Sequence, residues 1–304
     1  MHPQKKIQDI ASNVISLEKL IKYAAIIGES PSKGARSPVL WNKAYTSLRH
    51  TTRMIPIDVE YHLLNTLLEI LSNDLSFIGG AIAVPYKEKI AKWLGKNISS
   101  QASAIGAVNC IYRNSDGVLE GTNTDGEAAL ISVNSFIGNI TNKKILILGG
   151  GGSGKAVAAY MKTPVEPNGS VFVACRKNML NDVAIKELGI SACIKWEEID
   201  QLISTVDIII NCTTVGSQLS QNQSPLSLEQ LMTIQKTCLV FDIIYDPLES
   251  LLLKMARSLN LPAINGMRMN VDQAAISFAR ANFPDHTPTD IELFKHYMLQ
   301  SESY

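Results

Sequence analysis

The 304-residue sequence has no excess of charge of either sign, no apolar run of membrane-spanning length and no C-x-x-C spacing. Lysine and arginine number 28, as do aspartate and glutamate, so no bulk field favours nucleic acid or an anionic membrane surface. The longest apolar runs are about as long as a strand, whereas a bilayer requires roughly 20 apolar residues. A signal-peptide core is also lacking. We therefore expect a cytoplasmic protein, a monomer or homodimer, that acts on a small molecule.

The five cysteines and the five histidines lack the spacing of a metal site. Most of the cysteines lie in apolar segments, so we predict reduced core residues and neither disulfides nor metal ligands. They are Cys110, Cys175, Cys193, Cys212 and Cys238. With 46% hydrophobic and 18% charged residues, the composition is typical of a soluble globular protein, and the length allows two domains.

A glycine-rich turn follows a short apolar run and precedes a helix-like pattern of small residues. Gly149, Gly151 and Gly154 have the G-x-G-x-x-G spacing of a dinucleotide-binding fold, and Gly152 lies in the same turn. In such a fold the first glycine permits the turn, the second admits a pyrophosphate, and the third lets the helix pack on its strand. The helix N-terminus adds partial positive charge. The pattern therefore predicts dinucleotide binding.

Two other interpretations of this turn stay open. Gly149, Gly154 and Lys155 also fit the beginning of the G-x-x-x-x-G-K-[ST] phosphate loop, but Ala156 stands where that loop needs a hydroxyl for magnesium. The other alternative is a glycine turn with a structural role alone.

Two cations follow the next strand candidate, residues 170–174. At this position an NAD-specific fold usually has an acid that binds the ribose hydroxyls. Arg176 and Lys177 favour a 2′-phosphate instead, by their charge and by the two-pronged hydrogen bonding of the guanidinium. We therefore expect NADP in preference to NAD, with a solvated cation pair as the alternative.

Strand and helix patterns alternate on both sides of the turn and predict an α/β fold. Before it, we expect a helical stripe within 1–20, strands at 23–28, 54–59, from 77 and at 105–111, and helices at 39–48 and 61–71. After it, we expect strands at 207–211, 239–245 and 263–266, and helices at 247–259, 271–281 and from about 289. We predict a substrate domain over 1–125, with 269–304 packing back onto it, and a Rossmann domain over 126–268.

Three polar residues of the first series are candidates for chemistry. Lys87 begins a helix after Pro85, Asn109 lies inside the predicted strand, and Asp125 follows a hairpin-like segment. Alternatively, Lys87 is a solvated surface charge. Asp125 is alternatively the N-cap of a helix over about 127–136.

In order and local context these residues resemble the shikimate dehydrogenase family. IGAVNCIYR is similar to the family's IGAVNT segment, GTNTDG to its NTD segment and LGGGGSGKAV to its glycine-rich loop. Later segments that resemble the family are CRKN, DIIINCTTVG, FDIIYDPLESLLLKMA and NGMRMNVDQAAISF. The resemblance extends over about residues 23–280.

The resemblance implies NADP-dependent interconversion of a carbonyl and an alcohol on a cyclic hydroxy acid, 3-dehydroshikimate/shikimate or a relative, in aromatic amino acid biosynthesis. It assigns catalysis to Lys87 and Asp125, with Lys87 moving the proton of the substrate oxygen. It assigns substrate contacts to Ser37, Asn109, Tyr245 and Gln273. It adds Thr213, Val215 and Gly266 to the cofactor contacts.

Three departures from the family pattern concern the substrate. Ala81 and Ala83 replace an asparagine and a threonine, and Ala35 replaces the first serine of Ser-x-Ser-Pro in a loop one residue longer. A site built for ring hydroxyls loses on the order of 1 to 3 kcal/mol for each unpaired partner. We expect a relative of shikimate or quinate with different ring substitution, its carboxylate near Ser37 and Arg36. Shikimate itself, or an inactive nucleotide-binding sensor, are the alternatives.

Overall fold

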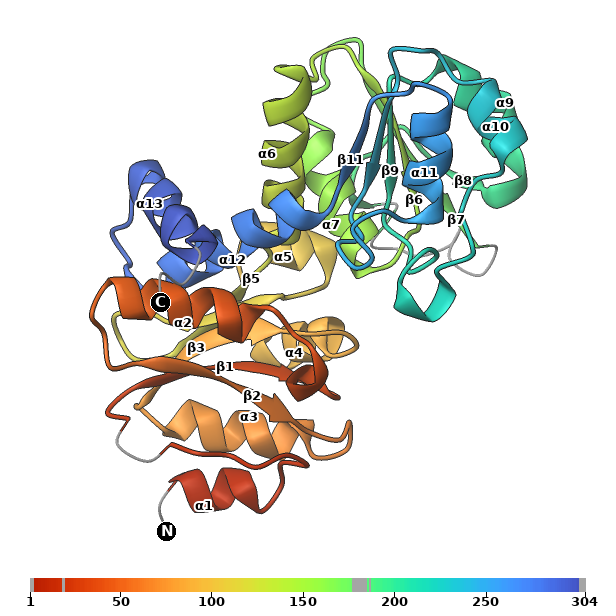
Figure 1. Ribbon diagram of the computed structural model, residues 1–304. Coiled ribbons are helices and arrows are strands. Elements are labelled where there is room, and N and C mark those ends of the chain that lie inside the picture. The colour runs from red at the N-terminus through yellow and green to blue at the C-terminus, as the bar shows by residue number, and fades with distance from the viewer. Residues whose placement is uncertain (1–2, 18–19, 177–184, 186, 301–304) are drawn as a thin grey trace. The chain divides into compact units, whose positions relative to one another are not determined.

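The computed structural model describes residues 3–17, 20–176, 185 and 187–300. The chain divides into two compact units, each built on a sheet of its own (Figure 1). The first unit runs to Thr124 and resumes at Val271, and the second is Asp125–Asn270. Two separate sheets with helices confirm the predicted α/β class with a two-domain organisation.

A five-stranded sheet with the order β2-β1-β3-β4-β5 organises the first unit. Strands β1, β2 and β3 pair in parallel, and β4 and β5 add an antiparallel hairpin. The strands are β1 (Tyr23–Gly28), β2 (Arg53–Asp58), β3 (Phe77–Ile82), β4 (Cys110–Arg113) and β5 (Leu119–Thr122). The helices are α1 (Pro3–Gln8), η1 (Pro31–Lys33), α2 (Ser37–Ser47), α3 (Leu64–Asn73), α4 (Lys87–Leu94), α5 (Ser100–Ile105), α12 (Met267–Asn282, in this unit from Val271) and α13 (Pro288–Leu299).

Strand β1 is buried along its whole length because apolar clusters cover both faces of the sheet. Tyr23, Ala25 and Ile27 belong to the cluster that contains α1, α3 and α4, whereas Ala24 and Ile26 belong to the cluster that contains α2, α12 and α13. This alternation follows from the two-residue period of a strand.

The C-terminal helices pack on α2 through rings around Phe278. Its ring centroid lies 5.3 Å from that of Trp41, 4.9 Å from that of Tyr45 and 5.1 Å from that of Phe294. Aromatic pairs at such separations add to the energy of apolar burial. Residues distant in the sequence thus complete the core of the first unit.

A six-stranded parallel sheet organises the second unit, with the order β11-β10-β9-β6-β7-β8. Counted from β6, this is the order 3-2-1-4-5-6 of a Rossmann fold. The strands are β6 (Lys144–Leu148), β7 (Ser170–Cys175), β8 (Ala192–Lys195), β9 (Ile208–Asn211), β10 (Leu239–Asp242) and β11 (Ala263–Asn265). The helices are α6 (Asp125–Ile137), α7 (Gly152–Met161), η3 (Trp196–Glu198), α9 (Ile199–Leu202), η4 (Ile203–Thr205), η5 (Gln218–Ser220), α10 (Leu228–Met232) and α11 (Leu251–Ser258).

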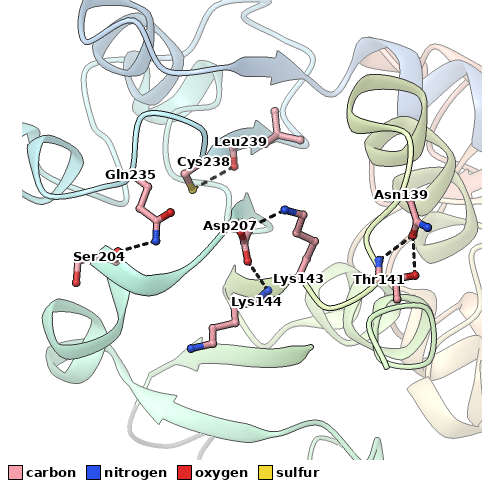
Figure 2. Close-up of polar contacts among 9 residues, drawn as sticks. All are labelled: Asn139, Thr141, Lys143, Lys144, Ser204, Asp207, Gln235, Cys238 and Leu239. Atoms are coloured by element: carbon pink, nitrogen blue, oxygen red, sulfur yellow. Dashed lines mark hydrogen bonds and ion pairs between the residues drawn. The ribbon is translucent and has the colours of Figure 1, made fainter. Parts of the chain in front are cut away.

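Asp207 joins the amino ends of three strands of this sheet. Figure 2 shows its contacts with Lys143 and Lys144. Its carboxylate accepts hydrogen bonds from the Lys144 backbone N at 2.8 Å and from Lys143 Nζ at 3.4 Å. Its backbone carbonyl accepts a hydrogen bond from the Leu239 N at 2.9 Å. These bonds hold β6, β9 and β10 in register at the edge opposite to their carboxyl ends.

Two predicted helices are shorter than expected. In the described residues 3–17 and 20, the stripe forms a helix only at Pro3–Gln8, and Val14, which the stripe predicts to be buried, is exposed. Helix α11 begins at Leu251 and not at Pro247 because Ser250 caps it, its Oγ accepting a hydrogen bond from the Leu253 N.

The predicted strand 105–111 is wrong in its first half. Ile105 ends helix α5, which Ser99 caps, and Gly106 continues the chain in the left-handed region at φ 71°. Asn109 therefore precedes strand β4 and does not lie inside a strand. A short apolar segment does not distinguish a strand from the end of a helix by itself.

All five cysteines are described, and none is in a disulfide in this structure. Of the helices in the described part of the chain, none combines the length and apolar character of a membrane span.

Candidate active site

The glycine turn connects β6 to α7, as its spacing predicts. Gly149 has a φ of 104°, which favours glycine. A Cβ on Gly154, in the first turn of α7, would lie 1.8 Å from the carbonyl oxygen of Gly149. A Cβ on Gly151, the N-cap of α7, would meet no atom within 4 Å. Gly154 therefore serves packing, while the open space beside Gly151 and the N-terminus of α7, where Gly152 is the first residue, fit a pyrophosphate.

The turn after β9 lies beside this glycine. Asn211 ends β9, and its Oδ1 accepts hydrogen bonds from the backbone N and the Oγ1 of Thr213, at 3.0 and 2.7 Å. Its Nδ2 donates to the Val215 carbonyl at 3.3 Å. A Cβ on Gly149 would lie 3.0 Å from the Thr213 Cγ2. Asn211 thus holds Thr213 and Val215 next to the glycine turn.

Asp242 extends this network to the next strand. It is fully buried at the end of β10, where its Oδ1 accepts hydrogen bonds from Asn211 Nδ2 at 3.0 Å and from the Ile244 N at 3.1 Å. Its Oδ2 accepts one from Ser250 Oγ at 2.5 Å. Burial raises the pKa of Asp242 to about 6, although these hydrogen bonds favour the carboxylate.

Tyr245 and Gly266 follow the ends of neighbouring strands. Strand β10 ends at Asp242, so Tyr245 lies beyond the strand that the sequence predicts to contain it, half-buried. Gly266 follows β11 and donates its backbone N–H to the Ile244 carbonyl at 3.0 Å. A Cβ on Gly266 would lie 1.8 Å from the Ile243 carbonyl oxygen, so this close approach requires glycine.

Arg176 directly follows β7 and is exposed, whereas Lys177 lies outside the described residues. In the described part of the chain, no three His, Cys, Asp or Glu side chains come together as metal ligands.

Lys87 begins helix α4, as predicted, and is half-buried. Its carbonyl accepts a hydrogen bond from the Val108 N at 3.0 Å, which brings the start of α4 next to the segment that leads into β4. Tyr86, just before Lys87, is buried and donates its hydroxyl to the Val59 carbonyl. The backbone at Lys87 is therefore fixed by the bond of its own carbonyl to Val108 and by the anchoring of the preceding residue, Tyr86.

Thr124 connects Asn109 with helix α12. The Asn109 Oδ1 accepts a hydrogen bond from the Thr124 N at 2.8 Å, and its Nδ2 donates to Thr124 Oγ1 at 3.0 Å. Thr124 Oγ1 also lies 3.0 Å from Ser277 Oγ and donates to the Gln273 carbonyl at 3.3 Å. The first unit thus places the Lys87 backbone next to the segment of Asn109, and Thr124 links the Asn109 side chain to the backbone of Gln273.

Asp125 is the first residue of α6, one residue after Thr124, and is buried. The predicted helix start near 127 was therefore two residues too late. Lys87 belongs to the first compact unit and Asp125 to the second.

One polar side chain of the loop before α2, that of Ser32, is hydrogen-bonded within the protein. Ser37 is the first residue of α2 and is buried. The side chain of Asp58, at the end of β2, accepts hydrogen bonds from both the N and the Oγ of Ser32, at 2.8 and 2.5 Å. The Ser32 hydroxyl is therefore engaged with Asp58.

The three alanines that depart from the family pattern share one apolar environment. Ala81 is buried in the cluster of α2, α12 and α13, and Ala35 and Ala83 pack against that cluster. A Cβ on Gly28 would lie 2.8 Å from the Ala83 Cβ, so residue 83 approaches the end of β1 too closely for a side chain at Gly28.

Comparison with known proteins identifies the relatives of this chain. A family model described as the shikimate dehydrogenase substrate binding domain matches residues 26–111. A protein of Methanococcus vannielii named shikimate dehydrogenase (NADP(+)) is 32% identical over 258 residues, which are 82% of this chain and 87% of that protein. This chain belongs to the shikimate dehydrogenase family. The resemblance seen in the sequence motifs is thereby confirmed.

Two further comparisons agree with the family assignment. A shikimate dehydrogenase (NADP(+)) of Caldanaerobacter subterraneus subsp. tengcongensis is 32% identical over 87% of this chain and 92% of its own length. A crystal structure of shikimate 5-dehydrogenase from Thermus thermophilus, in complex with NADP(H) and shikimate, superposes with a TM-score of 0.75 at 25% identity, covering 91% of this chain and 100% of that one. None of these relatives supports an inactive sensor.

Sequence reasoning about the shikimate dehydrogenase motifs missed the residues that position others. Asn211 and Asp242 lie in the segments DIIINCTTVG and FDIIYDPLESLLLKMA, but no role was predicted for them. Thr124 and Asp58 were missed in the same way. A polar residue at the end of an apolar strand is the signal that identifies Asn211, Asp242 and Asp58.

The raised pKa of Asp242 predicts a pH dependence of stability that Asp242→Asn removes. The folded state holds the Asp242 proton more tightly than the unfolded chain does. The stabilisation of the fold by protonated Asp242 is therefore fully present below about pH 4 and is lost as the pH rises through about 6. We expect the unfolding free energy of the natural protein minus that of Asp242→Asn to fall by on the order of 2 to 3 kcal/mol over this range. Urea unfolding at several pH values measures it, and a constant difference would contradict the prediction.

Proposed function

We propose that this protein is an NADP-dependent oxidoreductase that interconverts a carbonyl and an alcohol on a cyclic hydroxy acid. Family membership supports the reaction class. The observation that carries it is that the Lys87 carbonyl binds the Val108 N, next to Asn109, while Thr124 links the Asn109 side chain to the Gln273 carbonyl. In this proposal the first unit binds the substrate and the second binds the cofactor.

Lys87 moves the proton of the substrate oxygen, and its ammonium stabilises the negative charge that develops there. Asp125, joined by a peptide bond to Thr124, is the acidic partner of Lys87 in this proposal. Asn109 and Gln273 orient the ring by hydrogen bonds, and Ser37 and Arg36 bind the carboxylate, with Tyr245 as a further contact.

NADP would be held by the second unit and would supply or accept the hydride. Gly149, Gly151 and the N-terminus of α7 would hold the pyrophosphate, and Arg176 would bind the 2′-phosphate. The other residues proposed to contact the cofactor follow the carboxyl ends of β9 and β11: they are Thr213, Val215 and Gly266. Open space at Gly151 is the structural observation that fits this assignment.

Gly151→Ala and Gly154→Ala separate cofactor binding from folding. The methyl group at Gly151 meets no protein atom, so we expect an unchanged melting temperature and a Kd for NADP raised at least about tenfold, which is about 1.4 kcal/mol. The methyl group at Gly154 meets the Gly149 carbonyl, so we expect a lower melting temperature. Unchanged NADP affinity in Gly151→Ala would remove the pyrophosphate assignment.

Lys87→Ala is expected to lower kcat by roughly two orders of magnitude or more, with NADP affinity retained, because it removes a proton donor and a charge near the developing alkoxide. Steady-state kinetics and a cofactor titration measure the two effects. Lys92→Ala, an exposed position of the same helix, is the matched control and should keep full activity. Full turnover in Lys87→Ala would rule out its catalytic role.

For the substrate, we propose a relative of shikimate with fewer polar ring contacts on the side of Ala81 and Ala83. Both alanines belong to or pack against an apolar cluster, and Ser32 is already bound by Asp58. Buried hydroxyls of the substrate would lose their partners there.

A panel of shikimate, quinate and simpler cyclic hydroxy acids, each with NADP and NAD, tests this proposal by kcat/KM. We expect weak shikimate turnover that Ala83→Thr raises about tenfold, because the hydroxyl restores a polar partner for the ring. Ala192→Thr, on strand β8, is the control for the same chemical change. A shikimate kcat/KM of about 10⁴ M⁻¹s⁻¹ or more would show that shikimate itself is the substrate.

A further inference from the structure

Two cysteine side chains meet at the carboxyl end of β7, one residue before Arg176. The Sγ atoms of Cys175 and Cys193 lie 2.6 Å apart. Cys175 ends β7, and Cys193 lies on β8, the edge strand of the sheet. The reaction proposed above gives neither thiol a role.

The pairing of the two strands produces this contact. Strands β7 and β8 run parallel, with Val173 opposite Cys193. Side chains two residues apart on a strand project from the same face, so Cys175 and Cys193 share a face and meet diagonally. A disulfide requires about 2.04 Å between its sulfurs, so a closure of about half an ångström completes the bond without a change of register.

Through Cys193 the pair has an access to solvent that Cys110 and Cys238 lack. Cys193 is partly exposed, whereas Cys175 is only 1% exposed behind it. Burial raises the pKa of Cys110 to about 11 and that of Cys238 to about 12, and it also raises the pKa of Cys212. Since the thiolate is the reactive form, these three thiols are protected from oxidation.

We propose that Cys175 and Cys193 form a reversible disulfide that weakens the binding of NADP more than that of NAD. The oxidant is a hydroperoxide. The Cys193 thiolate attacks a peroxide oxygen, the O–O bond breaks, and Cys193 becomes a sulfenic acid as the other oxygen takes up a proton and leaves. The Cys175 sulfur then attacks the Cys193 sulfur, the S–O bond breaks, and water leaves with the Cys175 proton. Two thiols thereby lose two electrons and two protons to the peroxide, and a dithiol reverses the step by exchange.

The effect on the cofactor rests on the NADP site proposed above. Strand β7 lies between β6, which leads into the glycine turn, and β8. Closing the bond draws the end of β7 toward β8 and therefore away from β6. Arg176 directly follows Cys175, so its guanidinium moves with this strand end. NAD has no 2′-phosphate for that guanidinium to bind, so its affinity changes less.

Peptide mapping tests the bond itself. The full-length protein is reduced, desalted, treated with hydrogen peroxide, unfolded, alkylated and analysed by mass spectrometry. We expect a cross-link between the peptides of Cys175 and Cys193 with the loss of two hydrogen atoms, and alkylated Cys110 and Cys238 as internal controls. Cys193→Ser, or Cys193→Ala if the serine variant does not fold, should give no cross-link. Finding Cys175 still alkylated while Cys193 is oxidised would overturn the proposal.

Fluorescence titrations of NADP and NAD test the coupling. On oxidation we expect the Kd for NADP to rise about threefold or more, that for NAD to change less than about twofold, and a dithiol to restore both. Cys193→Ser should not respond to peroxide. A disulfide that leaves the ratio of the two Kd values unchanged would overturn the coupling. If the reduced protein does not bind NADP, the proposed cofactor site fails and the coupling with it, while the cross-link is decided by mass spectrometry alone.

Discussion

The hydrogen bond between Asn211 and Asp242 is the constraint on which the carboxyl edge of the six-stranded sheet depends. A parallel sheet leaves the ends of its strands as separate loops, and these loops must be aligned before they can form a site. Asn211 binds the turn of Thr213 and Val215, and Asp242 binds the N-cap of α11. Two buried side chains therefore align the loops after β9 and β10. Because both are buried, the loss of either partner leaves an unpaired polar group.

In the first unit, Asn109 and Thr124 align chain segments in a similar way. Their two hydrogen bonds join the segment before β4 to the end of the β4–β5 hairpin, and the Thr124 hydroxyl extends the network to α12. In both units an amide side chain supplies one donor and one acceptor, which suits it to bridging backbone groups from different segments. Asn109, which is proposed to touch the substrate, is thus held by Thr124, which need not touch it.

The departures from the family pattern lie at the proposed substrate wall and not among the residues proposed for the chemistry. Lys87 retains its place at the start of α4 and Asp125 at the start of α6, each held by local structure. Ala81 and Ala83, in contrast, extend the apolar cluster below α2 and α12. Replacing a polar side chain by alanine at the wall of a site changes which ring substituents are accepted, because each buried hydroxyl needs a partner.

The sequence by itself determined the family, the alternation of strands and helices, and the glycine turn, because these depend on local spacing and on motifs in a fixed order. It left open whether Ile105 ends a helix or begins a strand, since a short apolar segment fits both until Gly106 adopts its positive φ. Only the tertiary structure decided that Asn109 meets Thr124, that Asn211 meets Asp242 and that Ser32 is bound by Asp58. The contact of Cys175 with Cys193 arises in the same way, from the pairing of β7 with β8. Such contacts join residues far apart in the chain, and no local pattern encodes which strand ends become neighbours.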